Sequence, residues 1–237
     1  SLGVIALQVG QHAVALKLIR QAAALAPDNP SIHSNLGETY RNLRRFDEAI
    51  ASFRQALALQ PEFPIALNNL GNALAALGRL DEAIACCRQA LALQPDYANA
   101  HNNLGICLTK QGRLDEALVC FRRALALKPD FTDAHNNLGN VFKDQGRSDE
   151  ALACFQRALA LKPDFADAHN NLGNVFKDRG QLDEALASYR RALALKPDRP
   201  DIQSNLILAL QYRFGHEAEV IGAELRQTLP RLLLRQT

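Results

Sequence analysis

A 34-residue period runs through most of this 237-residue chain and limits what it can fold into. With Pro30 taken as position 1 of the repeat, the complete units span 30–63, 64–97, 98–131, 132–165 and 166–199. Glycine recurs at position 8, alanine at positions 20 and 27, and proline at position 32. A unit of this length cannot bury an apolar face alone, so such units stack on their neighbours in a linear array.

Each unit is predicted to form two helices. The first half ends near a glycine at position 15, which favours helix termination, although Arg44 takes this place in the unit 30–63. The second half opens with Asp-Glu-Ala, whose carboxylates favour a first helical turn, and it stops at the position-32 proline. Glycine inside a helix costs about 1 kcal/mol relative to alanine. Its recurrence at position 8 therefore indicates a closely packed helix, and we expect the position-20 alanine opposite it, with aromatic residues such as Tyr40 and Phe53 filling the remaining volume.

The period divides the chain into three parts. Residues 1–29 are predicted to be a partial N-terminal unit, residues 30–199 the five full repeats, and residues 200–237 the first helix of a further unit followed by a capping or linker helix. The pattern continues backwards to Gly3, Ala15, Ala22 and Pro27. The apolar residues of the expected capping helix are Val220, Ile221, Leu225 and Leu229. An incomplete terminal unit leaves apolar surface uncovered, so we also expect self-association through the exposed terminal repeats.

Composition excludes several classes of function. The formal net charge is +2, whereas binding to nucleic acid depends on clustered basic groups, so nucleic acid is not an expected partner. The absence of a run of eighteen apolar residues argues against a membrane partner or a spanning segment. Five cysteines, an odd number, without signal-peptide features favour reduced thiols and a cytoplasmic location.

No catalytic, cofactor or metal site is expected. The sequence lacks a Gly-rich phosphate loop, a nucleophile elbow and an HExxH motif, and its Asp-Glu pairs recur at helix starts. Histidines at position 4 and cysteines at position 23 lie a repeat apart. Zinc ligands must lie about 2.0–2.1 Å from the metal, and disulfides need Cα atoms within about 7 Å. The histidines are therefore not expected to bind metal, and the cysteines are expected to be buried thiols.

Helical geometry selects one polar face of the first helix. At about 100° per residue, positions 2, 6, 9 and 13 fall within roughly 60° of one another, with positions 5 and 12 beside them and positions 7, 8 and 11 on the packed side. This polar face is expected to line the concave space of the array. The candidate groove residues are Asn35, Asn69, Asn72, Asn103, Asn137, Asn140, Lys143, Asn171, Asn174 and Lys177.

The asparagine at position 6 recurs in every unit and suits a polypeptide ligand. A carboxamide donates and accepts, so it can pair with the N–H and C=O of a peptide main chain whatever the side chains are. The alternative is that these asparagines bond local backbone groups or tie one repeat to the next. For position 5, at the edge of the polar face, the structural interpretation is favoured.

The pattern N-L-G-x-x-[YFL]…D-E-A…[FYC]-x-x-A-L-x-L-x-P resembles the tetratricopeptide repeat over roughly residues 1–212. The resemblance implies an all-α, right-handed superhelical solenoid of helix-turn-helix repeats, with first helices lining a concave surface. The family's clamp-type domains carry Lys and Arg at positions 2, 5 and 6, where this chain has residues such as Asp133, Asn136 and Asn137. The Asn-Asn-Leu-Gly-Asn run instead resembles the O-linked N-acetylglucosamine transferase and Spindly-like group, in which an asparagine ladder holds a polypeptide.

Two functions are therefore expected of this chain. The first is a non-catalytic scaffold that binds a polypeptide segment or partner protein in its groove. The alternative is the substrate-recognition region of a larger protein O-glycosyltransferase, with a catalytic domain beyond residue 237. The segment Ser204–Leu208, followed by Tyr212, resembles the end of the repeats in bacterial members of that group.

Overall fold

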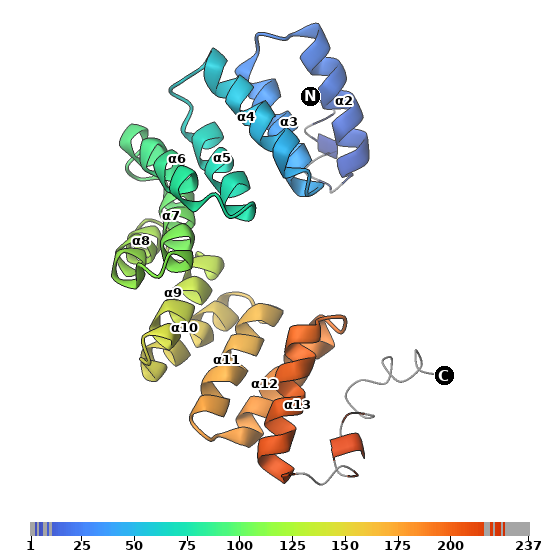
Figure 1. Cartoon of the computed structure of the whole chain (residues 1–237), viewed down its shortest axis with the longest axis vertical. Helices are drawn as coiled ribbons and strands as arrows, with labels where there is room; N and C mark the ends of the chain where they lie inside the picture. Colours follow the sequence, from blue (N-terminus) through green and yellow to red (C-terminus); the bar gives the residue numbers. More distant parts are fainter. Residues whose placement is uncertain are drawn as a thin grey trace. The chain divides into compact units, whose positions relative to one another are not determined.

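The computed structural model describes residues 3, 5, 6, 9, 11–215, 219, 221–223 and 225. Regular structure within these residues is helical (Figure 1). The chain divides into two compact units, residues 1–129 and 130–237. The helices of the first unit are α2 (His12–Leu25), α3 (Pro30–Asn42), α4 (Phe46–Leu59), α5 (Pro64–Ala76), α6 (Leu80–Leu93), α7 (Ala98–Lys110) and α8 (Leu114–Leu127). The helices of the second unit are α9 (Thr132–Asp144), α10 (Ser148–Leu161), α11 (Ala166–Asp178), α12 (Leu182–Leu195) and α13 (Pro200–Phe214).

Within each unit the helices pack in consecutive pairs. The pairs α3–α4, α5–α6 and α7–α8 form the first unit after α2, and α9–α10 and α11–α12 precede α13 in the second. Within a unit, the second helix of a pair also packs on the helix that follows it, as α4 does on α5, α6 on α7, α10 on α11 and α12 on α13. This arrangement confirms the predicted all-α solenoid, in which a repeat buries its apolar face against its neighbour.

The loop between paired helices requires a left-handed backbone conformation. Gly78, Gly112, Gly146 and Gly180 have φ between 73° and 76°. In α5, the backbone N–H of Arg79 bonds to the carbonyl of Leu74 at 3.0 Å, which closes the helix end across this glycine. Arg44 adopts φ 60° at the same position, a conformation that is unfavourable for a residue with a Cβ.

The helical glycine at position 8 lies against an aromatic ring, so the ring rather than the position-20 alanine is the group nearest to it, which corrects the expected order of the two. A Cβ built on Gly37, Gly105, Gly139 or Gly173 would lie 2.6 to 2.7 Å from the position-24 ring. In the unit 64–97, Cys87 replaces the ring, and a Cβ on Gly71 would meet its Sγ at 3.0 Å and the Ala83 carbonyl oxygen at 3.1 Å. The two helices therefore approach too closely for any larger residue at position 8.

The last cluster of buried residues lies between α12 and α13. Tyr189, Ile202 and Leu206 are buried in it, and Ile221 and Leu225 pack against its edge. A capping segment at the end of a repeat array covers such a cluster from solvent. The other two residues expected in the capping helix are Val220 and Leu229, and both lie outside the described residues.

Candidate functional site

The polar face of the first helices consists of positions 2, 6, 9, 12 and 13. All ten candidate residues are half-buried on this face, four in the first unit and six in the second. Positions 8 and 5 are buried behind it, as Gly139 and Asn136 illustrate. The structure therefore places the ten candidate residues at half-buried positions and the position-5 asparagines, predicted at the edge of this face, in the interior.

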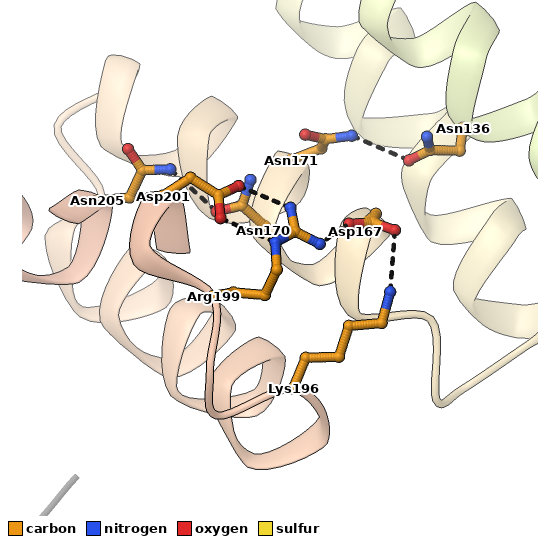
Figure 2. A network of polar contacts seen from close by, with 8 residues as sticks. All are labelled: Asn136, Asp167, Asn170, Asn171, Lys196, Arg199, Asp201 and Asn205. Carbon is orange, nitrogen blue, oxygen red and sulfur yellow. Dashed lines mark hydrogen bonds and ion pairs between the residues drawn. The ribbon is translucent and has the colours of Figure 1, made fainter. Parts of the chain in front are cut away.

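Adjacent repeats are joined by hydrogen bonds between asparagine side chains. The Nδ2 group at position 6 donates to the Oδ1 atom at position 5 of the preceding repeat. The three bonds run from Asn103 to Asn68 (2.9 Å), from Asn171 to Asn136 (3.0 Å) and from Asn205 to Asn170 (3.0 Å). Figure 2 shows the last two of these bonds. The sequence-based alternative, in which position 6 ties one repeat to the next, is therefore part of the structure.

The asparagines at position 5 are buried, with exposed fractions of 3% for Asn68 and 8% for Asn170. A buried carboxamide needs hydrogen-bond partners, because an unsatisfied polar group destabilises the folded state. In the first unit, the Nδ2 groups of Asn68 and Asn102 also donate to Oδ1 of the next residue, Asn69 or Asn103, at 3.4 Å. After these bonds, the Asn103 amide, which both donates and accepts, retains one N–H and one lone pair for a ligand.

An arginine network occupies the edge of the polar face in the second unit (Figure 2). Arg199 donates to both carboxylate oxygens of Asp201, at 2.8 and 2.6 Å, and to Asp167 at 2.7 Å. Lys196 adds a contact of 3.4 Å to Asp167. Partial burial raises the pKa of Asp167, but the hydrogen bond from Arg199 and the charges of Arg199 and Lys196 outweigh it and hold the pKa below its ordinary value.

Three other candidate residues of the second unit, Lys143, Lys177 and Asn174, also have side-chain partners. Nζ of Lys143 lies 3.1 Å from Oδ1 of Asp144, and Nζ of Lys177 lies 3.5 Å from Oδ1 of Asp178. Asn174 accepts a hydrogen bond of 2.8 Å from the hydroxyl of buried Tyr189, whose pKa is raised by burial. A hollow of about 420 Å³ adjoins Lys177, and its lining residues are Lys177, Asp178, Gly180, Leu182 and Tyr212.

The position-4 histidines bond to local backbone. Nε2 of His33, His101 and His169 lies 2.6, 2.9 and 2.9 Å from the carbonyl oxygen of the proline six residues earlier. Gln203 donates to Pro197 in the same way at 2.8 Å. Within the described part of the chain, no group of three or more His, Cys, Asp or Glu is placed to hold a metal ion.

The five cysteines are thiols, of which three are buried and two, Cys86 and Cys154, are half-buried. Cys87, Cys107 and Cys120 are buried, and burial raises the pKa of Cys120 to about 11. A thiol with such a pKa stays protonated near neutral pH and is a poor nucleophile. Among the described residues, no helix is long and apolar enough to cross a lipid bilayer.

Sequence analysis missed Arg199 and the partners of the position-6 amides. The aromatic residues of position 34 are Phe63, Tyr97, Phe131 and Phe165. Arg199 departs from this pattern, and that departure was the available signal. The signal for the amide pairs was the adjacent Asn-Asn at positions 5 and 6, such as Asn170 and Asn171.

These features define a domain of stacked helix pairs with a row of amides on its first helices. The family model described as the cilia and flagella-associated protein 70 C-terminal domain matches residues 1–209. The chain therefore belongs to this family of tetratricopeptide-repeat domains. No curated protein matches the chain significantly.

Solved structures of tetratricopeptide proteins are similar to this chain. TTC0263 of Thermus thermophilus, described as a thermophilic tetratricopeptide protein, is 29% identical with a TM-score of 0.67, over 76% of this chain and 98% of that one. PilW, described as a type IV pilus biogenesis factor, is 28% identical with a TM-score of 0.77, over 86% and 95% of the two chains. YrrB, described as a tetratricopeptide protein with an unusual peptide-binding site, has the same fold at 24% identity and a TM-score of 0.58, over 82% and 97%. The family and these structures support a protein-interaction scaffold.

Proposed function

We propose that the polar face of the first helices binds an extended polypeptide through its amides at positions 6 and 9. The observation that carries this proposal is the bonding pattern shared by Asn103, Asn171 and Asn205. Each donates one N–H to the preceding repeat and leaves its second N–H and at least one carbonyl lone pair for a ligand. A ligand main chain offers the complementary groups at every residue.

The repeat spacing also suits an extended ligand. Packed helices lie about 8–10 Å apart, and an extended chain advances about 3.3 Å per residue. An amide on each first helix would then meet about every third residue of the ligand. A peptide-binding site has been described on this fold in YrrB, which supports the same class of ligand here.

Position 9 offers the cleanest test. Substitution at position 6 removes the donor to a buried asparagine, whereas the side chains of Asn72 and Asn140 make no hydrogen bond with any described residue. We expect the Asn72→Ala, Asn140→Ala double variant to bind an array of short acetylated and amidated peptides at least several-fold more weakly than the wild type. Retained binding would overturn the proposal.

A matched control comes from the second helices. Gln89 and Gln156 are exposed amides on α6 and α10, away from the polar face. Their replacement by alanine removes the same number of carboxamides, and we expect peptide binding to persist. Circular dichroism then establishes that all variants keep the same helical content. An equal loss in both double variants would place the binding elsewhere than the polar face.

A second candidate is a substrate-recognition region in a protein O-glycosyltransferase. It is favoured by the Asn-Asn-Leu-Gly-Asn run and by the recurrence of the amides on one helical face. The sequence that follows residue 237 in the parent gene tests it. A nucleotide-sugar-binding α/β domain supports this function, and a stop codon or an unrelated domain contradicts it.

We also propose that the protein associates with itself through its N-terminal repeat. Ile5, Val9 and Val14 are exposed, with accessible fractions of 56%, 65% and 48%. Exposed apolar side chains of this kind favour contact between copies. Sedimentation equilibrium over a wide concentration range tests the point, and a strict monomer at high concentration would contradict it.

A further inference from the structure

We propose that the buried asparagines at position 5 are positioning residues that fix how the position-6 amides face a ligand. Three of these four residues, Asn68, Asn136 and Asn170, carry the inference. Each accepts a hydrogen bond from the amide of the next repeat at 2.9 to 3.0 Å. The ordering of the amides follows from these contacts alone, whereas its consequence for a ligand rests on the function proposed above.

The chemistry of the pair selects one orientation of the amide. The terminal torsion of asparagine is broad and roughly two-fold, so an isolated amide presents either its nitrogen or its oxygen. Oδ1 of Asn136 can only accept a hydrogen bond, and it is buried among the helices. Rotation of the Asn171 amide would bring a second acceptor to this atom and leave both without a donor. With its Oδ1 atom toward the next repeat, Asn136 therefore selects the orientation in which Nδ2 of Asn171 faces it.

The consequence is a row of amides with a uniform orientation. In the second unit, Asn171 and Asn205 donate to the preceding repeat in the same way (Figure 2). The remaining N–H and carbonyl of each amide then point the same way from one repeat to the next. A row ordered in this way before binding loses less conformational entropy on binding than a row of freely rotating amides.

The chain contains its own comparison in the first unit. Position 5 of the first full repeat is Ser34, which is buried and lacks a carboxamide. Its neighbour Asn69 accepts a bond from Asn68, but its Nδ2 group donates to no residue in the described part of the chain. Asn69 should therefore rotate more freely than Asn103, whose position-5 partner is Asn68.

Nuclear magnetic resonance of the side-chain amides in the ligand-free protein tests the ordering. In the wild type, we expect the Nδ2 group of Asn69 to have a lower order parameter than those of Asn103 and Asn171. In Asn136→Ala, the order parameter of the Asn171 amide should fall below about 0.6, the range of flexible groups. Asn136→Asp keeps an acceptor oxygen and should keep Asn171 ordered. A merely structural role for Asn136 would not produce this rescue at the Asn171 side chain.

A variant that is expected to order an amide, rather than to release one, gives a test that a loss of folding cannot imitate. Ser34→Asn supplies the missing acceptor, and we expect it to bring the order of the Asn69 amide up to that of Asn103. If Asn69 is already as ordered as Asn103 in the wild type, or if Ser34→Asn leaves it unchanged, the inference is wrong.

Peptide binding separates this inference from the proposed function. On the array of short acetylated and amidated peptides, we expect Ser34→Asn to bind several-fold more tightly than the wild type. If the wild type binds no peptide while the amide orders change as expected, the proposed function fails and the positioning role stands. If peptides bind but the amide orders do not respond, the positioning role fails and the proposed function stands.

Discussion

The ring of Phe155 lies directly on the backbone of Gly139, so that a Cβ on Gly139 would come 2.6 Å from Cε1 of the ring. Phe155 is fully buried, and the second helix of the repeat rests on the first through this contact. The same relationship holds between Gly105 and Phe121, and between Gly173 and Tyr189. It sets how closely the two helices of a repeat approach each other.

The first prediction concerns Gly139→Ala. Alanine is favoured over glycine in a helix by about 1 kcal/mol, but overpacking a filled core costs about 1–3 kcal/mol. We expect a net loss of up to about 2 kcal/mol in the free energy of unfolding, measured by urea denaturation. Gly71→Ala is the matched control, because a Cβ there meets Cys87 Sγ at 3.0 Å rather than a ring, and it should cost less. Equal losses in the two variants would contradict this account.

The second prediction concerns the loop residue Arg44. Its φ of 60° is one that glycine adopts without penalty, and glycine stands there in the other full repeats. Arg44→Gly should raise the free energy of unfolding by up to about 1 kcal/mol, after the entropy that glycine adds to the unfolded chain is subtracted. The reverse change, Gly146→Arg, should lower it. Thermal denaturation measures both, and a destabilised Arg44→Gly would refute the strain assigned to Arg44.

The third prediction concerns pH and the Arg199 network. Arg199 depresses the pKa of Asp201 through their hydrogen bonds, and it helps to depress that of Asp167 against the effect of burial. A carboxylate whose pKa is lowered by folding stabilises the protein above its unfolded pKa, about 3.9 for aspartate. This stabilisation disappears as the pH falls through the depressed folded values. Arg199→Leu should therefore lower the melting temperature at neutral pH and have little effect near about pH 2.

The outcome that would contradict this third prediction is a difference in melting temperature that stays constant from neutral to acidic pH. Such a constant difference would mean that Arg199 stabilises the protein by packing. Arg199→Phe serves as a control, because it restores the aromatic residue of the other repeats without restoring the charge. It should show the same loss of pH dependence as Arg199→Leu.

The fourth prediction concerns His169 and its contact with the Pro163 carbonyl. Gln203 makes the equivalent bond at 2.8 Å, so His169→Gln should leave stability nearly unchanged. His169→Ala removes the donor and should cost about 0.5–1.5 kcal/mol in the free energy of unfolding. Differential scanning calorimetry measures both variants. If addition of zinc raised the melting temperature of the wild type but not of His169→Gln, the contact with backbone would not be the role of this histidine.

Much of the fold follows from the sequence because the repeat encodes it several times over. The helix ends are specified by local chemistry, such as glycine at the left-handed loop position and proline after the second helix. The identity of the group opposite Gly139 did not follow, because positions 20 and 24 are one turn apart on the same helix face. The close approach of the helices, which no periodicity specifies, decides that the Phe155 ring covers the glycine.

The sequence predicts which side of the first helix each candidate residue lies on, but not the hydrogen bonds that its side chain makes. Neighbouring residues on a helix differ by about 100°, which is why position 5 is buried and position 6 is half-buried. The bond from Asn171 to Asn136 depends on the axial offset of two adjacent first helices, and this offset is set by packing. Arg199 was missed for a related reason, since its partners Asp167 and Asp201 belong to two different repeats.

The bond between Asn205 and Asn170 also bears on how arrays of this kind change length. Removal of residues 166–199, one whole period, would bring Asn205 next to Asn136, which is the same residue type at the same position as Asn170. The asparagine bond at the junction created by such a deletion is chemically the one that existed before, although Phe165 would replace Arg199 beside Asp201. Recombination between neighbouring copies can therefore lengthen or shorten the chain while keeping this bond between repeats.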